Sequence, residues 1–307
     1  MKMMNMMKIS LLFLMMILIS SCNQEEKKQD KKLNDIKILK VYCDEAIYKV
    51  LKSPLMTFDS IDVKVNLQIT QTTAFDAMKM FLAGECDVIL LPRNYTHYED
   101  SMMAVYGVKP HLRMPVAKDA LVFFVNYDSP LDTLNDKEIV DLILNKNKTF
   151  KEYYPILKKE PLLVTNNNKS SEVENIYQLV SKKQKINKAF QLLETSDSIK
   201  SFMLKNTGNI GIGYFSNIIG DPQFRALPIG FVDSSGKYVF PRTVHQSNIL
   251  QGFYPYIVTY WIYIQDQNND EAMRLARFIS KHPTAQKYFN DYGLVPAYAR
   301  INLIDER

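Results

Sequence analysis

Two long apolar runs, one near the middle of the chain and one near its end, constrain the fold more than any other feature. Residues 116–130, VAKDALVFFVNYDSP, and residues 254–264, YPYIVTYWIYI, are rich in aromatic and β-branched side chains. Each apolar core is too short for a helix and too continuous for a half-exposed strand, which predicts a buried strand. We interpret them as strands that carry the chain out of a first lobe and back into it. Two lobes joined by two strands form a hinge.

The segment before the first crossing strand alternates strands and helices. Residues 36–43, 63–69 and 86–91 are predicted strands, with amphipathic helices between them. Thr72 and Thr73 are suited to cap the second of these helices. The alternation predicts an α/β fold in which each lobe is a mixed, mainly parallel sheet flanked by helices, and ligands bind at the carboxyl ends of parallel strands.

The segment after the first crossing strand predicts a second unit of the same class. Residues 161–165, PLLVT, form a predicted strand that leads into a polar loop and a helix. Residues 190–202 are predicted to be helical, residues 210–215 to be a strand, and residues 226–239 to contain a hairpin.

The N-terminus has the pattern of a targeting segment. Lys2 and Lys8 precede an apolar run at residues 9–19 that is too short to span a bilayer. The run ends at Ile-Ser-Ser-Cys, which resembles the bacterial lipoprotein cleavage motif. We therefore expect residues 1–22 to be a lipoprotein signal peptide with a lipidated Cys22. An ordinary secretory signal with a chance cysteine is the alternative.

The remaining chain divides into a tether and two lobes. Residues 23–32, NQEEKKQDKK, contain no apolar side chain, so residues 23–35 are expected to be a solvated tether. Lobe 1 is expected to comprise residues 36–115 and 255–307, and lobe 2 residues 116–254. This organisation predicts a protein of the cell envelope, lipid-anchored to a bacterial membrane and facing the periplasm or the exterior.

Composition excludes several classes of protein. The 307 residues are 47% hydrophobic and 23% charged, as in soluble globular proteins, which excludes wholesale disorder and a multi-spanning membrane protein. The net charge of +5 is spread along the chain and forms no basic stripe, so we expect no nucleic-acid partner.

Catalytic and metal chemistry are not predicted. Cys43 and Cys86 are expected to be unbridged buried thiols, because one ends a strand and the other begins one. A nucleophilic Cys43 needs a histidine base nearby. The four histidines, His97, His111, His245 and His282, stand in unrelated contexts without metal-ligand spacing. We expect no enzyme activity and no cofactor.

Two loops carry the candidate binding residues. Arg93 follows the third predicted strand, where its planar guanidinium is able to bind an oxyanion, although an exposed loop arginine is an equal alternative. The polar loop that includes Asn168, Ser170 and Ser171 places hydroxyl, amide and backbone donors at a helix start, which favours anion binding. Plain helix capping is the alternative, since residues 171–174, SEVE, fit a capping box.

Short motifs in order along nearly all of the mature chain resemble the substrate-binding lipoproteins of phosphate ABC transporters, within the two-lobed periplasmic binding proteins. The similar segments are Ala83-Gly84-Glu85-Cys86-Asp87-Val88, Arg93 with Glu99, Lys118-Asp119-Ala120, Val125-Asn126, Pro130-Leu131, Leu134, Ser170-Ser171, Ile212-Gly213-Tyr214, Tyr254-Pro255 and Gly293-Leu294-Val295-Pro296. The resemblance implies lobes that close over inorganic phosphate or a similar oxyanion and present it to an ABC transporter permease. It also implies a monomer.

The resemblance also implies a role for each candidate residue. Arg93 supplies charge, Ser170 and Ser171 supply hydroxyl and backbone donors, Asn168 supplies an amide, and Asp44 accepts a proton from protonated phosphate.

The chain departs from the family at the ligand loops. Residues 43–45 are Cys-Asp-Glu where the family has small residues, Pro92 replaces a serine, and Glu172 adds a negative charge where the family has Ser-Gly-Thr. Carboxylates at these places repel an anion. The alternative function is therefore an envelope sensor or adaptor lipoprotein on the same scaffold, which binds a different ligand or a protein partner.

Overall fold

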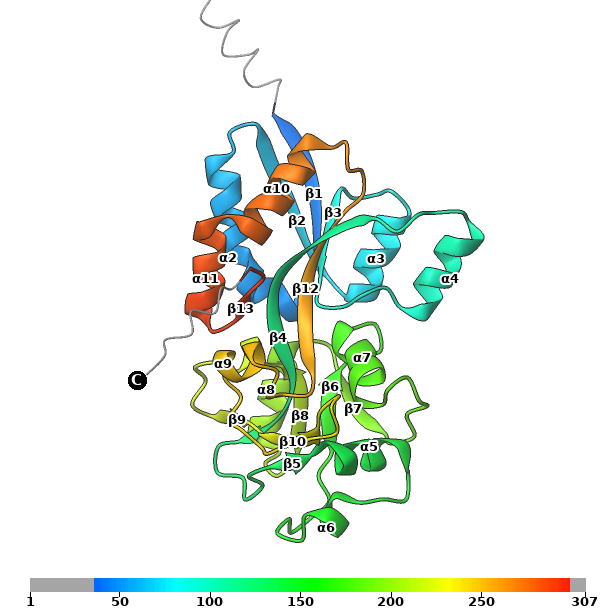
Figure 1. The fold of residues 1–307 in the computed structure, drawn as a ribbon, viewed down its shortest axis with the longest axis vertical. Helices are drawn as coiled ribbons and strands as arrows, with labels where there is room; N and C mark the ends of the chain where they lie inside the picture. Colours follow the sequence, from blue (N-terminus) through cyan, green and yellow to red (C-terminus); the bar gives the residue numbers. More distant parts are fainter. Residues whose placement is uncertain (1–35, 299–307) are drawn as a thin grey trace, which may run out of the picture.

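The computed structural model describes residues 36–298 and places them in two lobes, one above the other in Figure 1. The predicted signal peptide, Cys22 and the tether lie outside the described residues. No helix among residues 36–298 has the length and apolar character that crossing a membrane requires.

Lobe 1 is built from the first part of the described chain and its C-terminal part. Its elements are β1 (Lys37–Asp44), α2 (Glu45–Ile61), β2 (Val65–Thr72), α3 (Ala74–Leu82), β3 (Val88–Leu91), α4 (His97–Val105), the first half of β4 (Leu112–Asn126), β12 (Ile257–Ile264), α10 (Asp270–Lys281), α11 (Pro283–Tyr292) and β13 (Val295–Pro296). β1 pairs in parallel with β2 and β3. The predicted strand–helix alternation is confirmed, and Thr73 caps α3.

Lobe 2 contains the second half of β4 and the chain that follows it. Its elements are β5 (Leu134–Asn135), α5 (Asp136–Leu144), α6 (Phe150–Tyr153), β6 (Leu163–Asn166), α7 (Ser171–Asn175), the π-helical turn η1 (Ile176–Val180), β7 (Phe190–Leu193), α8 (Ser196–Lys205), β8 (Ile210–Tyr214), the 3-10 turn η2 (Phe215–Asn217), β9 (Phe224–Ala226), β10 (Ile229–Val232), β11 (Tyr238–Val239) and α9 (Gln246–Leu250). β6 pairs in parallel with β7 and β8. The predicted hairpin is confirmed, because β10 and β11 are antiparallel.

The strand order β2-β1-β3-β12-β4-β8-β6-β7 runs through both lobes. β4 makes this continuity possible because residues 112–120 pair with β12 while residues 121–126 pair with β8 or β9. β4 and β12 are antiparallel neighbours and lie side by side at the centre of Figure 1. The two predicted crossing strands are therefore present. The proposed lobe boundary at residue 116 falls inside the continuous strand β4.

A buried carboxyl group holds the hinge strands together. Asp119 on β4 is fully buried and accepts hydrogen bonds from Tyr260 on β12, at 2.5 Å, and from the backbone N–H of Ser216 in η2, at 3.2 Å. One side chain therefore connects both crossing strands to lobe 2.

The structure differs from the sequence-based prediction in one secondary-structure element and in the position of one helix cap. Residues 190–202 are not a single helix, because 190–193 form β7 at the edge of the sheet and Thr195 then caps α8. The predicted capping box at residues 171–174 is one residue out of register. Ser170 is the cap of α7, and its hydroxyl accepts from the backbone N–H of Val173 at 3.3 Å.

Candidate functional site

The carboxyl ends of four strands face one another where the two lobes meet. In lobe 1, β1 ends at Asp44 and β3 leads into Arg93. In lobe 2, β6 ends at Asn166 and leads to the Ser170 cap, and β8 ends at Tyr214. This is the edge at which open α/β sheets bind ligands. We call the contact region between the lobes the interlobe cleft.

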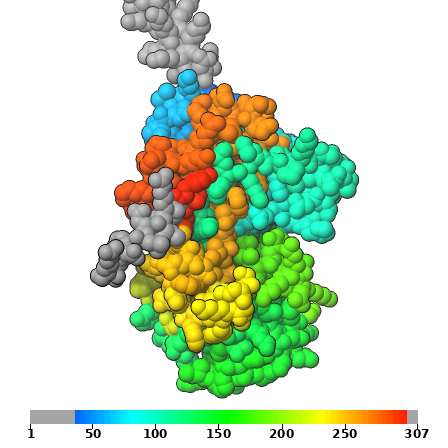
Figure 2. All heavy atoms as spheres, viewed as in Figure 1, coloured from blue at the N-terminus to red at the C-terminus, as the bar shows by residue number. Residues whose placement is uncertain are grey.

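The lobes are closed over this cleft. Asn175 of lobe 2 donates through Nδ2 to the carbonyl oxygen of Pro92 in lobe 1, at 2.8 Å. The backbone N–H of Phe75 donates to the carbonyl oxygen of Lys169 at 3.1 Å, and the Lys169 ammonium forms an ion pair with Asp76 at 3.2 Å. Figure 2 shows the lobes packed against each other at mid-height. The closed arrangement explains why the polar groups between the lobes are buried.

A second set of contacts joins the lobes beside helix α2. The backbone N–H of Ser196 donates to Glu45 at 3.2 Å, and Asn217 donates to the carbonyl oxygen of Ala46 at 3.1 Å. Burial raises the pKa of Glu45 to about 7, although the Ser196 hydrogen bond opposes this rise.

Asp44 lies at the centre of the interlobe cleft. Its side chain is 1% exposed, and Oδ1 accepts from the backbone N–H of Ala46 at 3.2 Å as the cap of α2. Oδ2 has no hydrogen-bond partner. Burial raises the pKa of Asp44 to about 6, against the lowering effects of the Ala46 hydrogen bond and the Arg93 charge. The free oxygen is an acceptor for a ligand that carries a proton.

Arg93 is buried, but its guanidinium group contacts residues of lobe 1, to which it belongs. Both terminal nitrogens donate to Glu99, each at 2.7 Å, and also reach the carbonyl oxygens of Asn94, at 2.8 Å, and Ala74, at 3.4 Å. Burial acts to lower the pKa of Arg93, but Glu99 outweighs it and the pKa is raised. The terminal donors are therefore committed, and Arg93 acts on the cleft through its charge.

Ser171 lies near Asp44 and Ser170 caps the same helix, whereas Asn168 is not part of this buried cluster. Ser170 and Ser171 are both buried, and Ser171 is fully so. Asn168 lies in an exposed turn between β6 and α7. The amide that reaches the buried cluster belongs to Asn166, which is 2% exposed.

Glu172 is a further candidate for the site, which the sequence indicated only as a departure from the family pattern. Its side chain is fully buried, Oε1 accepts from Asn166 Nδ2 at 2.7 Å, and Oε2 lies 3.4 Å from the Ser171 hydroxyl, which donates to it. Burial and then the Asp44 charge raise the pKa of Glu172 well above its ordinary value. Its inward orientation places a second carboxyl group in the cleft.

Asn175 and Tyr214 complete the lobe 2 wall. Asn175 Nδ2 donates to the Tyr214 hydroxyl at 2.8 Å, and burial raises the pKa of Tyr214 well above its ordinary value. Tyr214 belongs to the Ile-Gly-Tyr motif and Asn175 follows the serine loop, so both had a sequence signal. Among residues 36–298, the acidic, thiol and imidazole side chains form no group of three that could hold a metal ion.

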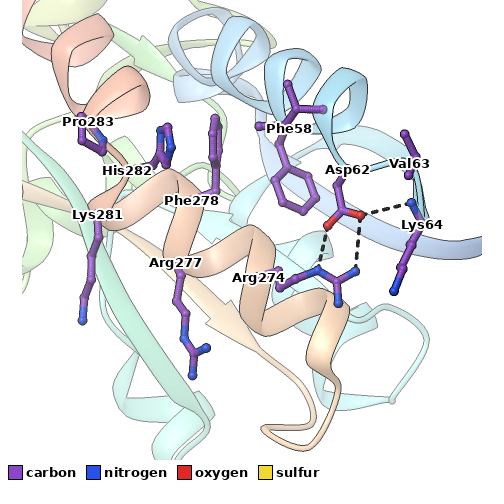
Figure 3. Close-up of a pocket in the computed structure, with 11 residues that line it drawn as sticks. Phe58, Asp62, Val63, Lys64, Arg274, Arg277, Phe278, Lys281, His282 and Pro283 are labelled. Carbon is purple, nitrogen blue, oxygen red and sulfur yellow. Dashed lines mark hydrogen bonds and ion pairs between the residues drawn. The ribbon is translucent and has the colours of Figure 1, made fainter.

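A surface pocket of about 740 Å³ lies elsewhere, on lobe 1 between the end of α2 and α10. Figure 3 shows Asp62 paired with Arg274, with 2.7 Å between Oδ2 and Nε, and the rings of Phe58 and Phe278 beside this pair. The pocket contains no side chain from lobe 2. It is therefore separate from the interlobe cleft.

Cys43 and Cys86 are both buried and are not joined to each other. Burial raises the pKa of Cys43 well above its ordinary value and that of Cys86 to about 12. Both are thus neutral thiols that pack in the lobe 1 core.

Comparison with known proteins identifies the scaffold. A family model described as a PBP superfamily domain matches residues 23–282. The chain belongs to the PBP superfamily. Protein SphX of Synechococcus elongatus is 21% identical over 261 residues, which is 83% of this chain and 76% of that protein.

Solved structures of two transport proteins have the same fold. A phosphate ABC transporter substrate-binding protein with bound phosphate from Clostridium perfringens matches with a TM-score of 0.68 and 16% identity, over 85% of this chain and 99% of that one. An ABC-type phosphate transport receptor from Vibrio cholerae matches with a TM-score of 0.63 and 14% identity, over 84% and 99%. The first is named a substrate-binding protein and the second a transport receptor, and neither is named an enzyme. The similarity confirms the two-lobed α/β fold.

Proposed function

We propose that the protein is a solute-binding protein that captures a small oxyanion, phosphate above all, between its two lobes for an ABC-type uptake system. The observation that carries this proposal is the proximity of Ser171, at the start of α7 in lobe 2, to Asp44, at the end of β1 in lobe 1, both of them buried. The phosphate-binding proteins of the same fold support the choice of ligand.

Different buried groups supply the hydrogen-bond donors, the positive charge and the acceptor for the ligand. Ser171 and Asn166 supply neutral hydrogen-bond donors, and the nearby Arg93 supplies positive charge without using its terminal nitrogens. Asp44 Oδ2 accepts the proton of a protonated phosphate oxygen, a contact that fully ionised sulfate cannot offer. An oxyanion in a buried site needs each oxygen paired, so this division favours a protonated ligand.

Delivery of the ligand to the transporter depends on the membrane targeting of the protein and on the hinge between its lobes. In this proposal Cys22 carries the lipid, residues 23–35 hold the body near the membrane, and a monomer closes by bending at β4 and β12 before it meets the permease. Replacement of Cys22 by serine is expected to move the protein from the membrane fraction to the soluble fraction. Retention of the variant on the membrane would refute lipid anchoring.

A calorimetric titration of the chain from residue 23 on, with phosphate, sulfate, molybdate and arsenate, tests the ligand. We expect saturable binding of phosphate that is weakened about tenfold in Ser171→Ala, because one buried donor is lost. Ser235→Ala, in the exposed hairpin turn, is the matched control and is expected to bind as the wild type does. Equal binding by both variants would remove Ser171 from the site.

The buried acids favour a second candidate, an envelope sensor or adaptor on this scaffold. Asp44 and Glu172 place two carboxyl groups in the cleft, which disfavours a fully ionised oxyanion. In this case the protein binds a different ligand or a protein partner. Absence of binding for every oxyanion tested would select it.

A further inference from the structure

The side chain of Glu172 occupies the hydrogen-bond donors that lobe 2 directs into the interlobe cleft. One carboxyl oxygen accepts from Asn166 Nδ2 at 2.7 Å, and the other lies 3.4 Å from the donating Ser171 hydroxyl. Glu172 is fully buried, so no water shell competes for these contacts. A carboxyl group bound in this way uses the same donors that an oxyanion would use.

A second observation shows that the surroundings of Glu172 remain unsatisfied. Oδ2 of Asp44 and Oδ1 of Asn166 are buried without a hydrogen-bond partner, although the two residues are 1% and 2% exposed. Asp44 is close enough to Glu172 for its charge to raise the Glu172 pKa, so its free oxygen belongs to the same cluster. Buried acceptors without donors cost stability. A ligand that brings its own protons would satisfy them, whereas the Glu172 side chain leaves them unpaired.

We propose that Glu172 is an internal competitor whose carboxyl group occupies the place of the bound oxyanion and must leave it before the ligand enters. The inference rests on the proposed function. It goes beyond that function because it assigns a specificity-determining residue. It accounts for a cleft whose lobes are joined by contacts such as Asn175 to Pro92 and Lys169 to Asp76 while Glu172 lies between them.

Truncation of the side chain tests this competition. Glu172→Ala removes the carboxyl group and frees Asn166 and Ser171, so phosphate is expected to bind about tenfold or more tightly than to the wild type. Glu172→Gln keeps the size of the side chain and still occupies the cleft, so it is expected to gain less than the alanine variant. Glu174→Ala removes an acid from the same helix whose partner is Gln178, at 2.7 Å, and is expected to change phosphate affinity little.

Calorimetric titration with inorganic phosphate gives the affinities, and thermal unfolding gives an independent measurement. Without phosphate, Glu172→Ala is expected to unfold at a lower temperature than the wild type, and saturating phosphate is expected to raise its Tm more than that of the wild type. Glu172→Ser replaces the alanine variant if the latter does not unfold cooperatively.

The outcomes separate the competition from the proposed function. If phosphate binds the wild type and binds Glu172→Ala equally or more weakly, the competition is wrong and the proposed function stands. A glutamine variant that gains as much as the alanine variant also overturns it, because a side chain of the same size then does not hinder the ligand. If neither the wild type nor the truncated variant binds any oxyanion, the proposed function fails, and the inference fails with it.

Discussion

Replacement of Asp44 by asparagine is expected to flatten the pH dependence of folding stability. Burial raises the pKa of Asp44 from 3.8 to about 6, so the folded protein binds this proton more tightly than the unfolded chain does. The stabilisation is complete below pH 4 or so and is lost as the pH rises through about 6. A shift of about two units, at about 1.4 kcal/mol per unit, corresponds to about 3 kcal/mol.

Asparagine reproduces the neutral form of this side chain. It remains an effective helix cap, so the contact with Ala46 survives the substitution. The wild type should therefore lose about 2 kcal/mol more than Asp44→Asn between pH of about 4.5 and 7.5, because about 1 kcal/mol of the total is already lost below pH 4.5.

Urea unfolding at a series of pH values measures this difference. Trp261, the single tryptophan, is half-buried on β12 and reports unfolding by fluorescence. Asp128→Asn, at an exposed acid on lobe 2, is the matched control and should retain the pH dependence of the wild type. Identical pH dependence in Asp44→Asn and the wild type would refute the argument that burial controls the ionisation of Asp44.

Two further substitutions test the packing around the hinge and the cleft. Arg93→Ala is expected to lower the free energy of unfolding in urea by about 3 to 5 kcal/mol, because it leaves Glu99 buried without its partner. A loss below about 1 kcal/mol would contradict the importance of this ion pair. Gly211→Ala is expected to lower the free energy of unfolding by about 1 to 3 kcal/mol, because its Cβ would overlap the Phe124 ring. Gly213→Ala is the control, since its Cβ would lie 3.8 Å from that ring, and an equal effect of both alanine substitutions would contradict the packing argument.

The fold was predictable because the apolar patterns that define it are local. The crossing strands were visible as apolar runs, since residues 119–126 of β4 are all buried and every residue of β12 is at least half-buried. Residues 190–202 were misread because the turn at Thr195 contains neither glycine nor proline. Pairing with β6 makes residues 190–193 a strand, and such pairing is not visible in a local sequence window.

The site was predictable only to within about one residue. Strand ends placed Asp44, Ser170 and Ser171 near the lobe boundary, where the structure buries them, and their contacts with a ligand stay predictions. The buried amide is that of Asn166 and not that of Asn168. A shift of one position rotates a helical side chain by about 100°, so the cap at Ser170 determines which way Glu172 points. The predicted capping box at residues 171–174 placed the cap one residue too late.

The pairing of Arg93 with Glu99 depends on tertiary geometry in the same way. Thr96 and Glu99 form a capping box at α4, which fixes the carboxylate where both arginine nitrogens reach it. The motif predicted an arginine and a glutamate in one loop. It did not predict that they would satisfy each other.

A crystal structure of the chain grown with phosphate tests the central claim most directly. The account predicts an anion between the lobes, in contact with Ser171 and Asp44, with the Glu172 side chain displaced from Asn166. A structure at saturating phosphate with an empty interlobe cleft and Glu172 still bound to Asn166 would contradict it.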